Sequence, residues 1–159
     1  MSVLAVFRWC ENTSVGAALR SSQWLFPVIE AWHLIALAVM GAAVLIVDLR
    51  LWGFGLRRRS IPEVAAAAQP LLLGSLVMMF VSGYMLFASS ALRYYYSVAF
   101  WLKMVALFFA LLYTFTLRRK IVMANQERVG PYWGRLAALV SIALWTGVGV
   151  SAKAIALLE

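Results

Sequence analysis

Two ionisable residues lie one helical turn apart near the start of the first long apolar run of this sequence. Glu30 and His33 form an E-x-x-H pattern, and Asp48 follows 18 residues after Glu30. A carboxylate and an imidazole on one helical face can exchange a proton, hold a metal ion or supply a haem ligand. This run therefore contains the first candidate residues for proton transfer, metal binding or haem ligation.

The helical repeat places these groups on one stripe. Eighteen residues make about five whole turns, so Glu30 and Asp48 should project in the same direction, with His33 about 60° away. The same arc contains Leu37, Gly41 and Val44. Ionisable groups are expensive in hydrocarbon, about 2.5–3.5 kcal/mol each at a helix centre, so we expect the stripe to face the protein interior.

His33 is the only histidine of the chain, and three roles are open to it. It could hydrogen-bond across helices, or it could be one axial ligand of a haem, with the second from a methionine, water or another subunit's His33. The available methionines are Met40, Met78, Met79, Met85 and Met104. E-x-x-H is also half of a di-iron motif, but that site needs a second copy and further carboxylates, which one chain lacks.

The remaining charges within the apolar runs allow structural or functional interpretations. Glu30 and Lys103 lie at similar depths, where they could form an ion pair or snorkel separately to the interface, or Glu30 could belong to a proton or ligand site. Asp48 stands beside Arg50, where it could fix the helix end or bind the arginines at 57–59. No pattern of a nucleophile triad or a phosphate-binding loop assigns a catalytic residue.

Membrane-spanning helices are the elements that would position these residues. The chain has 159 residues, is 65% hydrophobic, and has a mean hydropathy of +0.89. Four apolar runs of about twenty residues, each able to cross a hydrocarbon core, predict an all-α membrane protein, one four-helix bundle over residues 1–159. The predicted crossings are about 25–47, 70–89, 98–117 and 133–157. Residues 1–22 predict a helical segment in the membrane interface.

The net charge of +8 comes from basic residues beside the ends of the apolar runs, which is typical of membrane orientation rather than of nucleic-acid binding. Most follow the first and third crossings: Arg50, Arg57, Arg58, Arg59, Arg118, Arg119, Lys120, Arg128 and Arg135. The opposite side has Arg8, Arg20, Arg93 and Lys153. Because basic flanks stay in the cytoplasm, both termini are predicted to be periplasmic or external.

Five motifs are spread along almost the whole chain. They are S-x-W-L-F-P at 22–27, E-A-x-H at 30–33, D-L-R-L at 48–51, the lysine of FWLKM, and WGRLAALVSIALWTGVGV in the last run. Together they resemble a bacterial inner-membrane family of unknown function, although the ending SAKAIALLE departs from that family's G-R-W type. The early histidine is more distantly similar to copper-resistance D type membrane domains and some membrane cytochromes. The resemblance implies bacterial origin, an inner-membrane location and four helices, without a reaction.

Three functions from different classes follow. The first is a haem-binding or redox-associated membrane subunit, with His33 as axial ligand and Glu30 and Lys103 tuning the outer mouth of the site. The second is an oligomeric transporter or channel for a small solute or a proton, with the stripe from Glu30 to Asp48 as its polar path. The third is an accessory subunit of a membrane complex. The small-residue stripe of the last run, which would dock on a partner or a second copy, comprises Ala143, Gly147 and Ser151.

Overall fold

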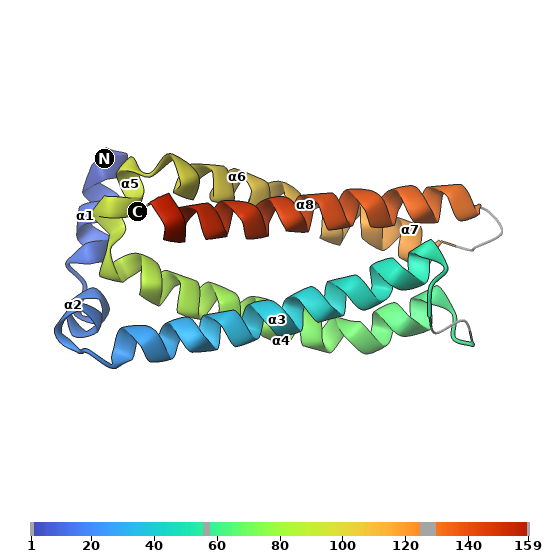
Figure 1. The fold of residues 1–159 in the computed structure, drawn as a ribbon, viewed down its shortest axis with the longest axis horizontal. Helices are drawn as coiled ribbons and strands as arrows, with labels where there is room; N and C mark the ends of the chain where they lie inside the picture. Colours follow the sequence, from blue (N-terminus) through green and yellow to red (C-terminus); the bar gives the residue numbers. More distant parts are fainter. Residues whose placement is uncertain (1, 56–57, 125–129, 159) are drawn as a thin grey trace. The chain divides into compact units, whose positions relative to one another are not determined.

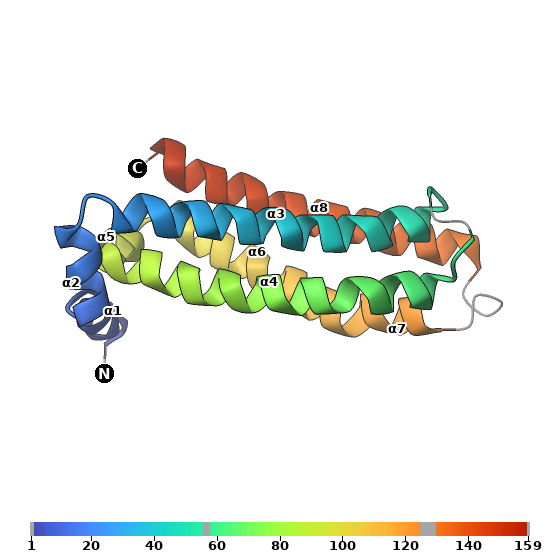
Figure 2. The ribbon, with the colours of Figure 1, turned by 90° about the horizontal axis from the view of Figure 1, so that it is seen from below.

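The computed structural model describes residues 2–55, 58–124 and 130–158, and all regular structure in these ranges is helical (Figures 1 and 2). Four helices are long and apolar enough to cross a membrane, which confirms the predicted all-α membrane fold. The elements are α1 (Val3–Glu11), α2 (Ser14–Ser21), α3 (Leu25–Trp52), α4 (Ile61–Ser89), α5 (Ala91–Tyr96), α6 (Val98–Tyr113), the π-helical turn η1 (Thr114–Arg118), α7 (Arg119–Met123) and α8 (Pro131–Leu158). Arg57 and Arg128 lie outside the described residues.

Helix α3 is 28 residues long, about 42 Å at 1.5 Å per residue. The hydroxyl oxygen of Ser22 accepts hydrogen bonds from the backbone N–H groups of Trp24 and Leu25 at its start. At its end Gly53 has φ +97°, and the N–H of Phe54 donates to the carbonyl of Leu49 at 2.9 Å. This is a Schellman-type ending, so the charged residues after position 47 continue the helix instead of leaving it.

Helix α4 begins well before the predicted crossing at 70–89. Ser60 and Glu63 form a capping box, in which the Ser60 N–H donates to a Glu63 carboxylate oxygen at 3.2 Å and the Glu63 N–H donates to Ser60 Oγ at 3.3 Å. Pro70, where we expected the crossing to begin, lies inside the helix. A proline removes one backbone hydrogen bond from a helix. Membrane helices tolerate this loss because neighbouring helices and side chains satisfy the backbone group that is left without its partner.

Helices α6 and α7 form one apolar span, Val98–Met123, through the π-helical turn η1. Within this span the Thr116 hydroxyl donates to the carbonyl of Leu112 and competes with the backbone ladder. Arg118, which we placed in a cytoplasmic loop, is therefore part of the span and is only 5% exposed. This corrects the loop assignment of that residue.

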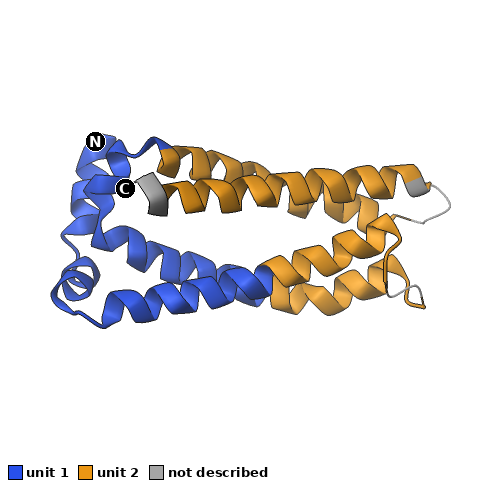
Figure 3. Ribbon diagram, in the orientation of Figure 1, with its two compact units in different colours: residues 1–40, 73–98 blue, residues 41–72, 99–159 orange. Residues whose placement is uncertain are grey.

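The chain divides into two compact units (Figure 3). The first comprises residues 1–40 and 73–98, and the second comprises residues 41–72 and 99–159. Because α3 and α4 each contribute to both units, the division falls within helices rather than at a linker. The expected single domain over residues 1–159 stays a prediction.

In the first unit, α1 and α2 lie across the direction of α3 and α4 (Figure 2). The Arg20 guanidinium donates to the carbonyls of Ala88 and Ser89 at 3.4 and 3.2 Å, and to the carbonyl of Glu11 at 2.7 Å. The Glu11 carboxylate accepts from the N–H of Leu92 at 2.6 Å. These bonds satisfy backbone groups at the end of α4 and the start of α5, and so attach the amino-terminal helices to them.

The second unit has its own apolar core. Segments of α3, α4, α7 and α8 contribute its buried residues Ala43, Val47, Leu51, Val64, Ala68, Val122 and Ala138. Large apolar side chains elsewhere on the four spans are exposed, for example Phe108 at 62% and Val150 at 64%. Such surfaces suit a lipid environment, because hydrocarbon solvates them without cost.

Candidate functional site

A buried ion pair occupies the second unit. Arg118 Nε donates to Asp48 Oδ1 at 2.7 Å, and Arg118 Nη2 donates to the carbonyl of Val44 at 2.9 Å. The Asp48 side chain is fully buried and that of Arg118 is 6% exposed. Charge-assisted hydrogen bonds of this kind are strong, and burial removes the competing water. The pair joins α3 to the π-helical turn.

The turn η1 is held against α8 by two hydrogen bonds beside Arg118. The Tyr113 hydroxyl donates to the carbonyl of Ala137 at 2.8 Å, and Trp145 Nε1 donates to Thr114 Oγ1 at 3.2 Å. A π-turn widens the helix, and such turns occur frequently at functional sites. Here the turn ends at Arg118, the residue that reaches Asp48.

Two buried oxygen atoms near the ion pair lack hydrogen-bond partners among the described residues: Asp48 Oδ2 and Ser141 Oγ. Ser141, on α8, lies close enough to the Asp48 carboxylate to interact with it, but the two groups do not have hydrogen-bond geometry. A buried polar group left unsatisfied costs about 1–3 kcal/mol. The half-satisfied carboxylate of Asp48 is therefore the strongest candidate for chemistry in the described part of the chain.

The observed partner of Asp48 differs from the partners that we expected. We predicted that Asp48 would fix the helix end beside Arg50 or bind the cluster at 57–59, but it pairs with Arg118. The Arg50 guanidinium instead donates twice to the carbonyl of Arg59, at 3.0 and 2.9 Å. One signal in the sequence pointed to the observed pair: Asp48 and Arg118 each end an apolar run that crosses in the same direction.

Glu30 and Lys103 belong to different compact units, so their pairing stays a prediction. Glu30 is exposed, and Lys103 on α6 is partly buried. The expected stripe from Glu30 to Asp48 does not face the interior along its whole length, because Glu30 and Gly41 are exposed whereas Val44 and Asp48 are buried. Other buried positions of α3 are Ala36, Met40, Ala43, Val47 and Leu51.

His33 lies in the first unit, partly buried between α3 and α4. Its Nδ1 is 2.8 Å from Ser82 Oγ, and the Ser82 hydroxyl donates to the carbonyl of Met78 at 2.6 Å. Because Ser82 has one hydroxyl proton, His33 Nδ1 must be the donor in this pair. The absence of a side chain at Gly83 makes room for the ring, since a Cβ there would lie 3.3 Å from His33 Cε1.

The other sequence signals are spread over the fold. On α8, Ala143 and Gly147 are exposed, while the buried Ser151 hydroxyl donates to the carbonyls of Gly147 and Val148. Within residues 2–55, 58–124 and 130–158, no group of three or more His, Cys, Asp or Glu side chains could hold a metal ion. The structure thus brings Arg118 and Ser141 close to Asp48. Sequence reasoning did not single out either of these two residues as a partner of Asp48.

Comparison with known proteins identifies the family of the chain. Neither curated proteins nor solved structures match the chain. The family model described as "Family of unknown function (DUF6644)" matches residues 6–157, from α1 to the carboxy-terminal part of α8. A family of unknown function agrees with the resemblance, whereas bacterial origin and a link to copper resistance stay predictions. The chain belongs to this family of unknown function, DUF6644.

Proposed function

We propose that the protein is a membrane transport protein in which Asp48 takes up and releases a proton. The supporting observation is the unpartnered Asp48 Oδ2 beside the unpartnered Ser141 hydroxyl, both buried within membrane-length helices. Ionisable residues inside membrane spans are rare, and in pumps and transporters they form proton relays. In the sequence analysis the polar path included Glu30. In this proposal only Asp48 and its neighbours Arg118 and Ser141 are functional.

The three side chains have complementary roles in this proposal. A proton on Asp48 Oδ2 would donate to Ser141 Oγ, while Oδ1 keeps its bond from Arg118. When the proton leaves, the Ser141 hydroxyl can rotate and donate to the carboxylate instead. Ser141 therefore serves both states, because a hydroxyl is both a donor and an acceptor. Arg118 keeps its charge throughout and holds the carboxylate in place.

Proton flux into proteoliposomes containing a pH-sensitive dye tests this function. We expect flux with the wild-type protein and a fall to the protein-free level with Asp48→Asn, because an amide cannot release the proton. Glu63→Gln is the matched control, since it removes an exposed carboxylate at the start of α4. Asp48→Asn leaves Arg118 unpaired, so Asp48→Asn with Arg118→Gln is measured as well, and it should fold without flux. Wild-type protein without flux at any pH, or Asp48→Asn with full flux, would contradict the proposal.

A haem-binding or redox-associated subunit is the second candidate, and the tautomer of His33 favours it. With Nδ1 donating to Ser82, Nε2 carries the lone pair that an axial ligand needs. Histidine ligands of metals are commonly held by such a second hydrogen bond. In this alternative Glu30, one turn before His33 on α3, would tune the outer mouth of the site, and the contribution that we expected from Lys103 stays a prediction.

Absorbance after haem supplementation tests the second candidate. We expect a Soret band with the wild-type protein that disappears in His33→Ala and persists in Asp48→Asn, because the carboxylate lies in the other unit. Wild-type protein without a Soret band under these conditions would overturn the candidate.

The membrane location and the assembly remain parts of the proposal. Among the described residues, Arg50, Arg119 and Lys120 lie near the ends of the first and third spans, Arg58 and Arg59 follow the first span, and Arg135 lies near the start of the fourth. They support an inner-membrane protein with both termini external, by the positive-inside rule. The exposed small residues Ala143 and Gly147 leave room for a second copy or a larger complex to approach α8 closely.

A further inference from the structure

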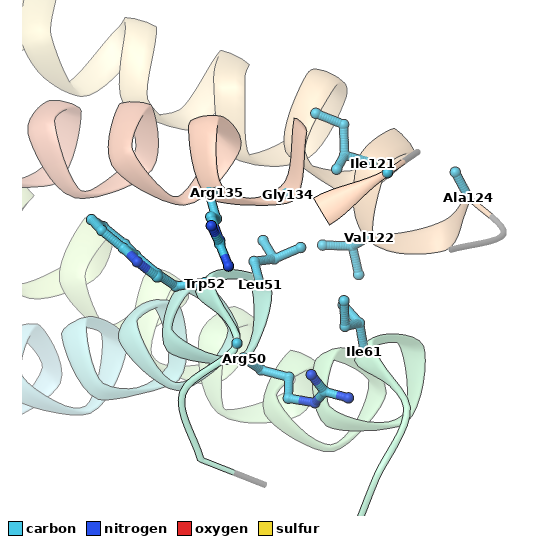
Figure 4. A pocket seen from close by; sticks show the side chains of 11 residues that line it. Arg50, Leu51, Trp52, Ile61, Ile121, Val122, Ala124, Gly134 and Arg135 are labelled. Atoms are coloured by element: carbon cyan, nitrogen blue, oxygen red, sulfur yellow. The ribbon is translucent and has the colours of Figure 1, made fainter. Parts of the chain in front are cut away.

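A pocket of about 260 Å³ lies in the second unit, where α3 and α7 end and α4 and α8 begin (Figure 4). Its formation depends on the close approach of α8 to α3. Gly134 of α8 is buried against the end of α3, and a Cβ at this position would lie 3.2 Å from the carbonyl oxygen of Leu51. The pocket is thus built into the helix packing of this unit.

The lining combines positive charge with apolar surface. Arg135 extends from α8 toward Leu51 and Trp52 of α3 (Figure 4). Arg50 supplies a second guanidinium, held in place by the Arg59 carbonyl. None of the described lining residues carries a carboxylate. The pocket therefore suits an anion that is attached to an apolar group.

The position of the pocket along the spans matches the level of lipid headgroups. Leu51 lies near the end of α3, and Gly134 lies in the first turn of α8. The neighbouring aromatic residues Tyr132 and Trp133 are both exposed. Exposed tyrosine and tryptophan side chains at the ends of membrane helices are typical of the membrane–water interface.

We propose that this pocket binds the phosphate headgroup of an anionic phospholipid. The phosphate forms charge-assisted hydrogen bonds with Arg135, Arg50 adds positive charge to the same lining, and the glycerol region lies on the apolar lining. A volume of about 260 Å³ is below the roughly 300–1,000 Å³ of pockets that enclose drug-sized ligands, so the acyl chains stay in the bilayer. Free inorganic phosphate fits less well, because it would leave the apolar lining without a partner.

Native mass spectrometry of the purified full chain in detergent, titrated with dioleoyl phosphatidylglycerol, tests the assignment. We expect a retained lipid adduct whose affinity falls roughly tenfold in Arg135→Gln, as loss of a charged hydrogen bond implies. Arg119→Gln is the matched control: it removes an exposed positive charge that does not line the pocket, and should keep wild-type affinity. An equal loss of lipid affinity in both variants would show that the arginines act only by general electrostatic attraction, and this result would overturn the proposal.

A second variant tests the pocket without changing charge. Ala124 lines the pocket, and Ala124→Leu should fill part of it and weaken the adduct while all arginines remain. Two further titrations identify the source of the anion. Phosphatidylcholine should bind at least tenfold more weakly than phosphatidylglycerol, and inorganic phosphate should not displace the lipid. Unchanged lipid binding in Ala124→Leu, equal binding of the two lipids, or displacement by inorganic phosphate would each overturn the proposal.

Discussion

Replacing Arg118 by methionine is expected to lower the free energy of unfolding by about 3–5 kcal/mol. The substitution leaves the Asp48 carboxylate buried without its cation, and the Val44 carbonyl loses its donor. Methionine is similar in length and helix propensity, so the loss reports mainly on the ion pair. Denaturant unfolding in detergent micelles, followed by circular dichroism, measures the change.

A control variant and a double variant separate the effect of the ion pair from the effect of losing a charge. Arg119→Met removes the neighbouring charge, which is exposed, and should change the free energy of unfolding by no more than about 0.5 kcal/mol. Asp48→Leu combined with Arg118→Met should recover most of the loss, because replacing both members of a buried pair by apolar groups is often neutral. If Arg118→Met costs no more than Arg119→Met, the buried pair is not a stabilising feature of this fold.

Replacing Gly16 by alanine is expected to destabilise the amino-terminal helices of the first unit by about 1–3 kcal/mol. A Cβ at Gly16 would lie 2.5 Å from the carbonyl oxygen of Ala88 and 2.7 Å from that of Glu11. Both atoms belong to the backbone, so no side-chain rotation relieves the clash, and α2 must move away from the end of α4. Hydrogen exchange of the amides in α1 and α2 should become faster.

Gly74→Ala in α4 provides the control for this substitution. Gly74 is also helical and lies in the same unit, but nothing lies within 4 Å of its added Cβ. Alanine has the higher helix propensity, so this variant should be neutral or more stable by up to about 1 kcal/mol. Similar exchange rates in the Gly16 and Gly74 variants would show that α2 does not depend on the close approach to Ala88.

Local signals in the chain account for the parts of the fold that were predictable. The four spans follow from the length of apolar runs, which needs no knowledge of neighbouring helices. The start of α4 was also readable, because Ser60 and Glu63 have the spacing of a capping box. We instead predicted a crossing that begins at about Pro70, but this residue lies inside α4, where a membrane helix tolerates a proline.

The sequence alone determined that the chain has four helices long and apolar enough to cross a membrane, and that the carboxylate of Asp48 lies at the end of the first apolar run. Its pairing with Arg118 was decided by tertiary structure. Hydropathy is a property of each segment, but pairing depends on the direction in which side chains leave separate helices. The burial pattern of α3 leaves Glu30 exposed, and the π-turn at Thr114–Arg118 ends at the residue whose guanidinium reaches Asp48.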